Sequence, residues 1–202
     1  MPLLPARPIH RMTPRTNPFR ADRLDLLPYF FEGETYNEKA WESLLARLEF
    51  FDFRAAIVGP KGRGKSTLMN HFAPRLQERG WNVHRLKLCS AQRNFESEIW
   101  SRLETFQKQD FVLLDGAEQL SFWRWKCFLR LTRRTGGLLI SSHRAGLLPT
   151  LWECRSSSQL LQSLLFQLAP ESQNEMQAQM LFEKHRGNLR DALRELYDIH
   201  SR

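Results

Sequence analysis

The feature that most constrains this chain is a run of eight residues with three glycines, Gly59-Pro-Lys-Gly-Arg-Gly-Lys-Ser66. The run fits the pattern G-x-x-x-x-G-K-[ST] in full. An apolar stretch at 54–58 precedes it, and residues 66–79 after it have the apolar spacing of a helix, which Pro74 is expected to kink or stop. Strand, glycine loop and helix thus follow one another in the order typical of a phosphate-binding loop.

The chemistry of such a loop gives each residue type a part. Glycines let backbone N–H groups curl around phosphate, and the start of the following helix carries partial positive charge. We predict that Lys65 reaches the β and γ phosphates of a nucleotide, that Ser66 gives its hydroxyl to Mg²⁺, and that Thr67 helps at the α phosphate. The competing interpretation is a glycine-rich turn with a surface lysine. The predicted binding set comprises Gly59, Pro60, Lys61, Gly62, Arg63, Gly64, Lys65, Ser66 and Thr67.

A second contact for the metal is predicted at Asp115. The apolar run 111–114 before it is typical of a buried parallel strand, which would present a carboxylate at its end beside the glycine loop. This carboxylate would reach Mg²⁺ through water, so Ser66 and Asp115 are the candidate metal ligands. The alternative is an aspartate that caps a turn before Gly116.

The chain divides into three segments. Residues 1–27 are rich in proline and arginine, so we expect an arm that wraps the core or stays mobile. Residues 28–155 alternate strand-like and helical runs, which predicts an α/β core with a mainly parallel five-stranded sheet. Residues 156–202 show helical spacing only, behind capping serines, and are predicted to form a small helical lid. Strands are expected at 54–58, 81–88, 111–114, 138–143 and 150–154, and core helices at 36–53, 66–79, 92–108 and 122–134.

The amino-acid composition limits which partners and which cellular location can be expected. Thirty Lys and Arg residues against 22 acids give a net charge of +8, which leaves open an anionic partner beyond the nucleotide, nucleic acid included, or a basic surface that serves solubility. The three cysteines are widely spaced, which argues against a disulfide framework or a zinc site. No apolar run approaches the roughly 18 residues of a membrane span, and the N-terminus lacks a secretory pattern. We therefore expect no membrane span and a cytoplasmic location.

With these motifs, residues 29–202 resemble the additional-strand P-loop ATPases and, within them, the AAA+ type. The run Phe111-Val-Leu-Leu-Asp115 looks like the Walker B strand of that family. The resemblance implies a three-layer α/β fold, ATP with Mg²⁺ as cofactors, and a switch or remodeller whose nucleotide state sets oligomerisation or partner binding. ATP and ADP as bound partners and a homo-oligomer are part of that expectation.

The resemblance also implies roles for single residues. Ser141 or Ser142, at the end of the next strand, stands where the family places a polar sensor, and we take Ser142 as the candidate. Arg190, in Gly187-Asn-Leu-Arg190, is similar to a sensor arginine of the lid; the alternative is a charge on a solvated helix face. Three other arginines are each a candidate arginine finger, which would contact the nucleotide of a neighbouring copy in an oligomer. The alternative for each is a solvent-exposed structural role. The three arginines are Arg133, Arg134 and Arg144.

One departure from the family concerns hydrolysis. The catalytic glutamate of the family normally follows the Walker B aspartate directly, yet this position is Gly116 here, and the nearest acid is Glu118. Glu118 either orients the attacking water from further along the chain, or the protein binds ATP and hydrolyses it slowly, as a switch would. We favour weak hydrolysis, with Lys65, Asp115, Glu118, Ser142 and Arg190 as the candidate catalytic residues.

Two other functions compete. Small P-loop kinases have a similar length and use the same loop, although their lid is inserted within the core and does not follow the last strand. The second competing function is a nucleic-acid adaptor with a regulatory ATP site. It is suggested by Phe122-Trp-Arg-Trp-Lys126, in which aromatic and cationic residues alternate. The plainer interpretation is that these aromatic residues bury against the core beside Leu129 and Leu131. A GTPase is disfavoured because the chain has no N-K-x-D sequence.

Overall fold

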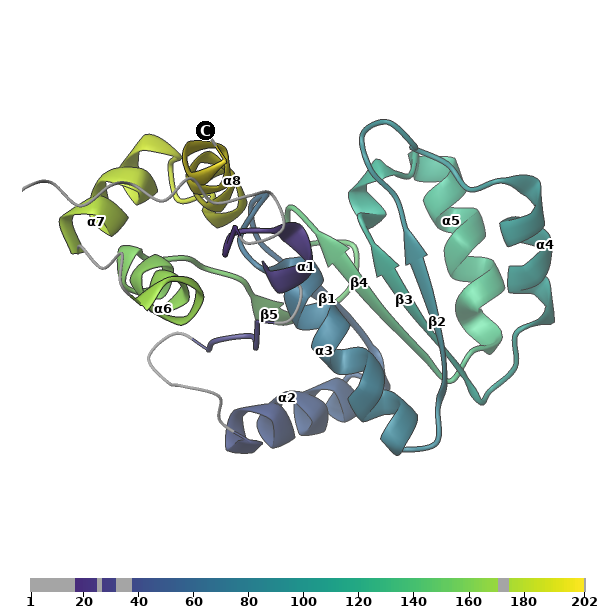
Figure 1. The fold of residues 1–202 in the computed structure, drawn as a ribbon. Coiled ribbons are helices and arrows are strands. Elements are labelled where there is room, and N and C mark those ends of the chain that lie inside the picture. The colour runs from purple at the N-terminus through teal and green to yellow at the C-terminus, as the bar shows by residue number, and fades with distance from the viewer. Residues whose placement is uncertain (1–16, 25–26, 32–37, 171–174, 202) are drawn as a thin grey trace, which may run out of the picture. The chain divides into compact units, whose positions relative to one another are not determined.

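The computed structural model describes residues 17–24, 27–31, 38–170 and 175–201 (Figure 1). The backbone contacts divide the chain into two compact units. We call Pro28–Ser156 the core unit, and Met1–Leu27 together with Ser157–Arg202 the helical unit. The expected arm at 1–27 lies mostly outside the described residues.

The core unit is built on a five-stranded sheet of order β2-β3-β4-β1-β5. Every pair of neighbouring strands is parallel, which confirms the predicted sheet. All six residues of the central strand β4 are buried, as expected of a parallel strand covered on both faces. The strands are β1 (Arg54–Val58), β2 (Asn82–Lys87), β3 (Asp110–Asp115), β4 (Gly137–Ser142) and β5 (Thr150–Glu153).

Helices cover both faces of this sheet, which gives three layers (Figure 1). Successive residues of a strand point to opposite faces, so Ile57 packs with the helices of one face and Val58 with those of the other. The first face carries α2 (Glu38–Phe50) and α3 (Lys65–Glu78). The second carries α4 (Ser97–Thr105) and α5 (Phe122–Leu131), with the short 3₁₀ turns η1 (Ala117–Gln119) and η2 (Thr132–Arg134) on either side of α5.

Two helix expectations need correction, the stop at Pro74 and the length of the helix at 92–108. Pro74 does not stop α3, which continues to Glu78 with the exposed proline inside it. The helix expected at 92–108 is α4, which is much shorter, because Phe95 and Phe106 are buried outside its ends. Phe106 has extended backbone angles and stacks on His84. Its place in the apolar pattern therefore reflects burial and not helix.

The helical unit contains the short turn α1 (Ala21–Leu24) and three longer helices, α6 (Ser158–Leu168), α7 (Glu175–Lys184) and α8 (Leu189–His200). The hydroxyl of Ser157 caps α6 by accepting from Leu160 N at 3.1 Å, which confirms the expected serine cap. The side-chain amide of Asn17 donates to Tyr197 O at 2.9 Å, so the start of the described chain packs at the end of α8. None of the helices in the described ranges is both long and apolar enough to span a bilayer.

Candidate nucleotide site

The strands β1, β3 and β4 end at the same edge of the sheet. In the ladder Val58 pairs with Ser142, and Leu114 pairs with Ile140, so the residues that follow Val58 and Leu114 emerge beside the end of β4. In open parallel sheets this carboxyl edge is where ligands bind. The sequence motifs predicted for phosphate and metal therefore come together in space.

The glycine loop leaves β1 through Gly59 and enters α3 through Gly64. Gly59 has a φ of 146°, and a Cβ at this position would lie 2.6 Å from the carbonyl oxygen of Cys154. Any side chain here would push the loop away from β5. Gly64, with a φ of 85°, caps the first turn of α3 without any side-chain hydrogen bond, which leaves the first N–H groups of the helix directed at the loop.

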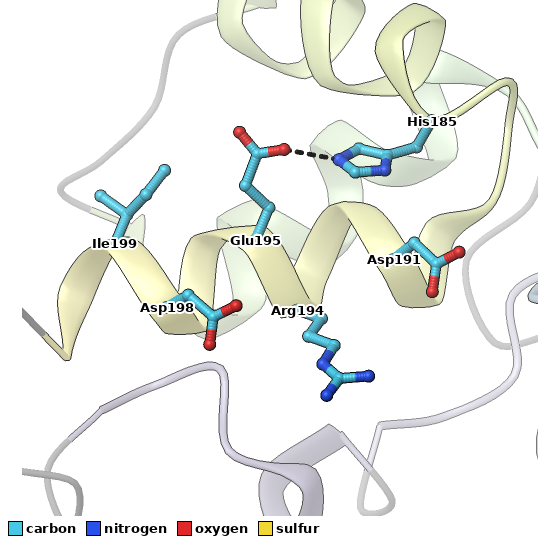
Figure 2. Close-up of a pocket in the computed structure, with 6 residues that line it drawn as sticks. All are labelled: His185, Asp191, Arg194, Glu195, Asp198 and Ile199. Carbon is cyan, nitrogen blue, oxygen red and sulfur yellow. Dashed lines mark hydrogen bonds and ion pairs between the residues drawn. The ribbon is translucent and has the colours of Figure 1, made fainter.

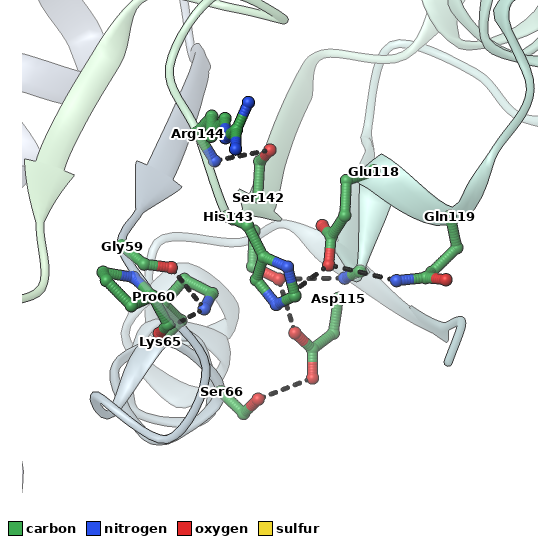
Figure 3. Close-up of polar contacts among 12 residues, drawn as sticks. Gly59, Pro60, Lys65, Ser66, Asp115, Glu118, Gln119, Ser142, His143 and Arg144 are labelled. Carbon is green, nitrogen blue, oxygen red and sulfur yellow. Dashed lines mark hydrogen bonds and ion pairs between the residues drawn. The ribbon is translucent and has the colours of Figure 1, made fainter. Parts of the chain in front are cut away.

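Lys65 is buried at 8% exposure, which is rare for a lysine. Its Nζ donates to Gly59 O at 2.6 Å and to Pro60 O at 2.9 Å (Figure 3). The ammonium group thus lies inside the loop, where it neutralises carbonyl dipoles. A surface lysine would be solvated, so the glycine-rich-turn interpretation does not describe this residue.

Asp115 joins the loop to the neighbouring strand. Its Oδ2 accepts a hydrogen bond from Ser66 Oγ at 2.7 Å, and its Oδ1 accepts one from the hydroxyl of Ser141. Ser141 Oγ in turn accepts from Gly116 N at 2.9 Å, so the serine fixes both Asp115 and the turn after it. The candidate metal ligands Ser66 and Asp115 are in direct contact, so a hydroxyl and a carboxylate, both oxygen donors of the kind that Mg²⁺ prefers, lie together beside the loop.

The serine at the end of β4 that contacts Asp115 is Ser141, whereas the predicted sensor Ser142 faces elsewhere. Both are buried. Ser142 Oγ accepts from Arg144 N at 3.4 Å and lines a pocket of about 300 Å³ on the other side of the strand. Neighbouring residues of a strand point to opposite faces, which is why only one of the two serines reaches the aspartate.

Glu118 lies in the turn η1 directly after Gly116. Its Oε1 is held by His143 Nε2 at 3.3 Å and by Gln119 Nε2 at 3.3 Å (Figure 3). Its Oε2 is buried and has no hydrogen-bond partner in the described part of the chain. A carboxylate with one fixed oxygen and one unsatisfied oxygen is suited to accept a hydrogen bond from water. The sequence does not predict His143, since a histidine after a strand carries no signal of its own.

Tyr29 and Cys154 are further residues that the sequence motifs do not indicate. The Tyr29 ring lies against Gly64, where a Cβ would be 3.2 Å away, and its hydroxyl donates to Cys154 Sγ at 3.4 Å. The same hydroxyl accepts from Trp152 Nε1 at 3.0 Å. Burial raises the pKa of the Cys154 thiol to about 11, so it is an inert packing group. These contacts hold β5 against the phosphate loop.

The remaining candidate arginines are exposed. Arg133, Arg134 and Arg144 are exposed on the core unit, and no carboxylate in the described ranges forms an ion pair with them. Arg190 is exposed in the first turn of α8, within the helical unit. Its role as a lid sensor stays a prediction.

A second hollow, of about 570 Å³, lies along α8 in the helical unit (Figure 2). Glu195 on its wall is bonded to Lys184 Nζ at 2.7 Å and to His185 Nε2 at 2.6 Å, and these contacts lower the carboxyl pKa. Nowhere in the described residues do three or more His, Cys, Asp or Glu side chains gather as a metal site would require.

No family profile matches this chain, and no curated protein matches its sequence. Solved structures do match. RuvB of Thermotoga maritima, a Holliday junction branch migration motor, superposes with a TM-score of 0.54 at 19% identity, over 80% of this chain and 60% of its own. A replication initiator DnaA bound to AMPPCP and single-stranded DNA gives 0.56 at 16% identity, over 84% and 62%. Domain III of the T. maritima DnaA gives 0.53 at 14% identity, over 81% and 82%.

Identities this low show the fold alone, and the chain spans only about 60% of the RuvB chain. The matches extend over about four fifths of this chain, whose parallel five-stranded sheet has helices on both faces. The chain therefore has the AAA+-like fold of the P-loop NTPases.

Proposed function

We propose that this protein binds ATP with Mg²⁺ in the glycine loop and acts as a nucleotide-dependent switch with weak ATPase activity. The observation that carries the proposal is the buried Lys65 inside the loop next to the bonded pair Ser66 and Asp115. A lysine, a hydroxyl and a carboxylate at a helix N-terminus form a set that suits a triphosphate with its metal. One of the matched structures lends support, since that DnaA is bound to AMPPCP, an ATP analogue.

Each residue has a defined part in this proposal. Lys65 exchanges a loop carbonyl for phosphate oxygens, which are stronger acceptors because they are charged. Ser66 through its hydroxyl and Asp115 through its carboxylate would hold the metal, and their hydrogen bond already places the two groups together. Mg²⁺, when bound, neutralises charge that develops on the phosphates. The residues that fit it are Ser66 and Asp115.

Slow hydrolysis is proposed because the general base is displaced from its usual position. Glu118 has one free, buried oxygen for a water, but it is held through His143 and Gln119 and stands beyond the turn at Gly116. A switch needs an ATP state that lasts long enough to be sensed by a partner. We further propose that Arg190 senses the nucleotide from the lid, that an exposed arginine of a second copy acts in trans in a homo-oligomer, and that the protein works in the cytoplasm.

The experiment compares ATP and ADP binding by calorimetry, with Mg²⁺, and phosphate release for the same samples. Lys65→Ala should weaken ATP binding by at least about tenfold, because a hydrogen bond to a charged group contributes about 1.5–3 kcal/mol. Lys108→Ala removes an exposed lysine of the core unit and is the matched control. Equal ATP affinity in the two variants would contradict the proposed site.

Glu118→Gln separates binding from hydrolysis in the same assay. We expect unchanged ATP affinity and phosphate release that falls by at least about tenfold, since general-base catalysis contributes about 10²–10⁴-fold where it operates. Unchanged release would remove Glu118 from the mechanism while leaving the binding proposal intact.

A further inference from the structure

The stretch 119–152 of the core unit contains no acidic residue. It covers the end of η1, all of α5, η2 and β4, the loop into β5 and most of β5. Its cations are Arg124, Lys126, Arg130, Arg133, Arg134 and Arg144. The 22 acids of the chain all lie elsewhere, so the positive charge of this stretch is not balanced along the chain.

The charge is not balanced in space either. All six cations of the stretch are exposed, and none of them forms an ion pair with a carboxylate in the described residues. Of the two acids that flank the stretch, Glu118 is bonded to His143 and Glu153 to Arg155. A surface with this charge attracts polyanions.

Two exposed aromatic side chains belong to the same stretch as these cations. Phe122 is 63% exposed and Trp123 is 79% exposed, whereas Trp125 and Phe128 are buried against the sheet. The expectation that the aromatic cluster buries is thus correct for Trp125 and wrong for Phe122 and Trp123. The two exposed rings contact one another edge to face, with centroids 5.4 Å apart. Their outer faces are left to solvent.

The exposed rings and two cations share one face of α5. Phe122, Lys126 and Arg130 follow one another four residues apart, the spacing that aligns side chains on a helix, and Trp123 flanks them. Lys126 Nζ lies 5.4 Å from the centroid of the Phe122 ring, which confirms the alignment. We call Phe122, Trp123, Lys126 and Arg130 the α5 face.

We propose that the α5 face binds single-stranded nucleic acid. Unpaired bases would stack on Trp123 and Phe122, and Lys126 and Arg130 would meet the phosphates on either side. An acidic peptide would use the cations but has no need of two exposed rings. A lipid surface would need a broader apolar area, and the other exposed residues beside the two rings, Ser121 and Arg124, are polar. Rings set among unpaired cations fit a chain of bases and phosphates better than either.

This surface is distinct from the nucleotide loop and does not rest on the proposed ATP binding. Phe122 and Arg144 do line the same pocket as Glu118 and Ser142, so a strand on the α5 face would lie beside the candidate water-positioning residue. Lys65 belongs to the glycine loop and not to the α5 face, so nucleic acid should bind to Lys65→Ala as it does to the wild type. Failure of one proposal leaves the other standing.

The test is fluorescence anisotropy of a labelled oligo-dT of about 20 nucleotides, long enough for one site of this kind, with the full chain at several salt concentrations. Trp123→Ala should weaken binding by about fivefold or more, because stacking on one aromatic ring contributes about 1–3 kcal/mol per base. Phe50→Ala is the matched control, since Phe50 is 81% exposed on α2. Arg130→Ala should lower the salt slope by about 0.7, the value for one phosphate contact in a single strand, while Arg79→Ala at the exposed end of α3 should not.

Poly-glutamate and vesicles of phosphatidylserine and phosphatidylcholine distinguish the other occupants. We expect Trp123→Ala to lower the affinity for oligo-dT and to leave any weak binding of poly-glutamate unchanged. Equal oligo-dT affinities for Trp123→Ala and Phe50→Ala would overturn the proposal, as would no salt-dependent binding by the wild type. Tighter binding to the vesicles or to poly-glutamate than to oligo-dT would also overturn it, in favour of a membrane or an acidic protein.

Discussion

At the scale of single residues, Gly116 explains why the usual catalytic glutamate is missing after Asp115. Its φ is 88°, and a Cβ at this position would lie 2.5 Å from the carbonyl oxygen of Leu88. Leu88 N also donates to Asp115 O at 2.8 Å, so the backbone that follows β2 is fixed where a side chain would need to go. The turn after β3 therefore excludes every residue with a Cβ, and the nearest carboxylate has to come from η1.

Gly116→Glu tests this account of the turn. The substitution restores the family pattern in sequence, yet we expect no gain in phosphate release and a free energy of unfolding lower by about 2 kcal/mol or more, from the positive φ and the backbone clash together. Gly146→Glu is the matched control, because Gly146 has a φ of 115° but no atom within 4 Å of the place that a Cβ would take. Urea unfolding and phosphate release on both variants give the answer. A stable Gly116→Glu protein with faster release would contradict it.

Prediction from the sequence is most successful for residues that belong to a short motif of fixed spacing. The glycine loop, Lys65, Ser66 and Asp115 meet as expected, because a loop of fixed spacing between a strand and a helix leaves little choice of geometry. His143 and Tyr29 could not be predicted, since each reaches the site through contacts between segments far apart in the chain. The choice between Ser141 and Ser142 depends on strand orientation, which two consecutive serines do not reveal.

At the scale of elements, α3 contains a proline where the sequence pattern predicts a kink or an end. Pro74 is exposed inside the helix and cannot donate the hydrogen bond to the carbonyl of Asn70 that an α-helix normally makes there. The helix continues because its apolar stripe, including Phe72 and Leu76, is fully buried against the sheet. Burial of that stripe outweighs the lost hydrogen bond.

Pro74→Ala should therefore stabilise the protein. Proline in a helix interior costs about 3 kcal/mol relative to alanine, and its stiffening of the unfolded chain offsets up to about 1 kcal/mol, so we expect a gain of about 2–3 kcal/mol in the free energy of unfolding. Gln77→Ala, another exposed position of α3, provides the baseline in urea unfolding. A loss of stability in Pro74→Ala would mean that the proline makes contacts that the helix needs.

The boundaries of elements are less predictable than their order. The alternation of strands and helices follows from apolar runs that are buried on both faces, and the sequence predicts it correctly through the core. The helix expected at 92–108 shrinks to α4 because buried aromatic residues outside a helix produce the same spacing as those within it. Burial sets the apolar pattern, whereas hydrogen bonding sets the ends of the helix.

At the scale of the whole molecule, the proposed switch requires the helical unit to respond to the nucleotide. Arg190 is the residue of that unit on which the proposal depends. It is exposed in the first turn of α8, and no carboxylate in the described ranges forms an ion pair with it. An arginine kept unpaired at the surface is available for an anion, and the γ phosphate carries the charge that distinguishes ATP from ADP.

Arg190→Ala should consequently lower the affinity for ATP by about tenfold and the affinity for ADP by much less, because the lost hydrogen bonds are to a charged group that only ATP has. Arg194→Ala removes an exposed arginine one turn further along α8 and should change neither affinity. Calorimetry with both nucleotides measures the ratio directly. Equal losses for ATP and ADP would show that Arg190 acts on the fold of the helical unit and not on the γ phosphate, and no loss would assign it to the solvated face of α8.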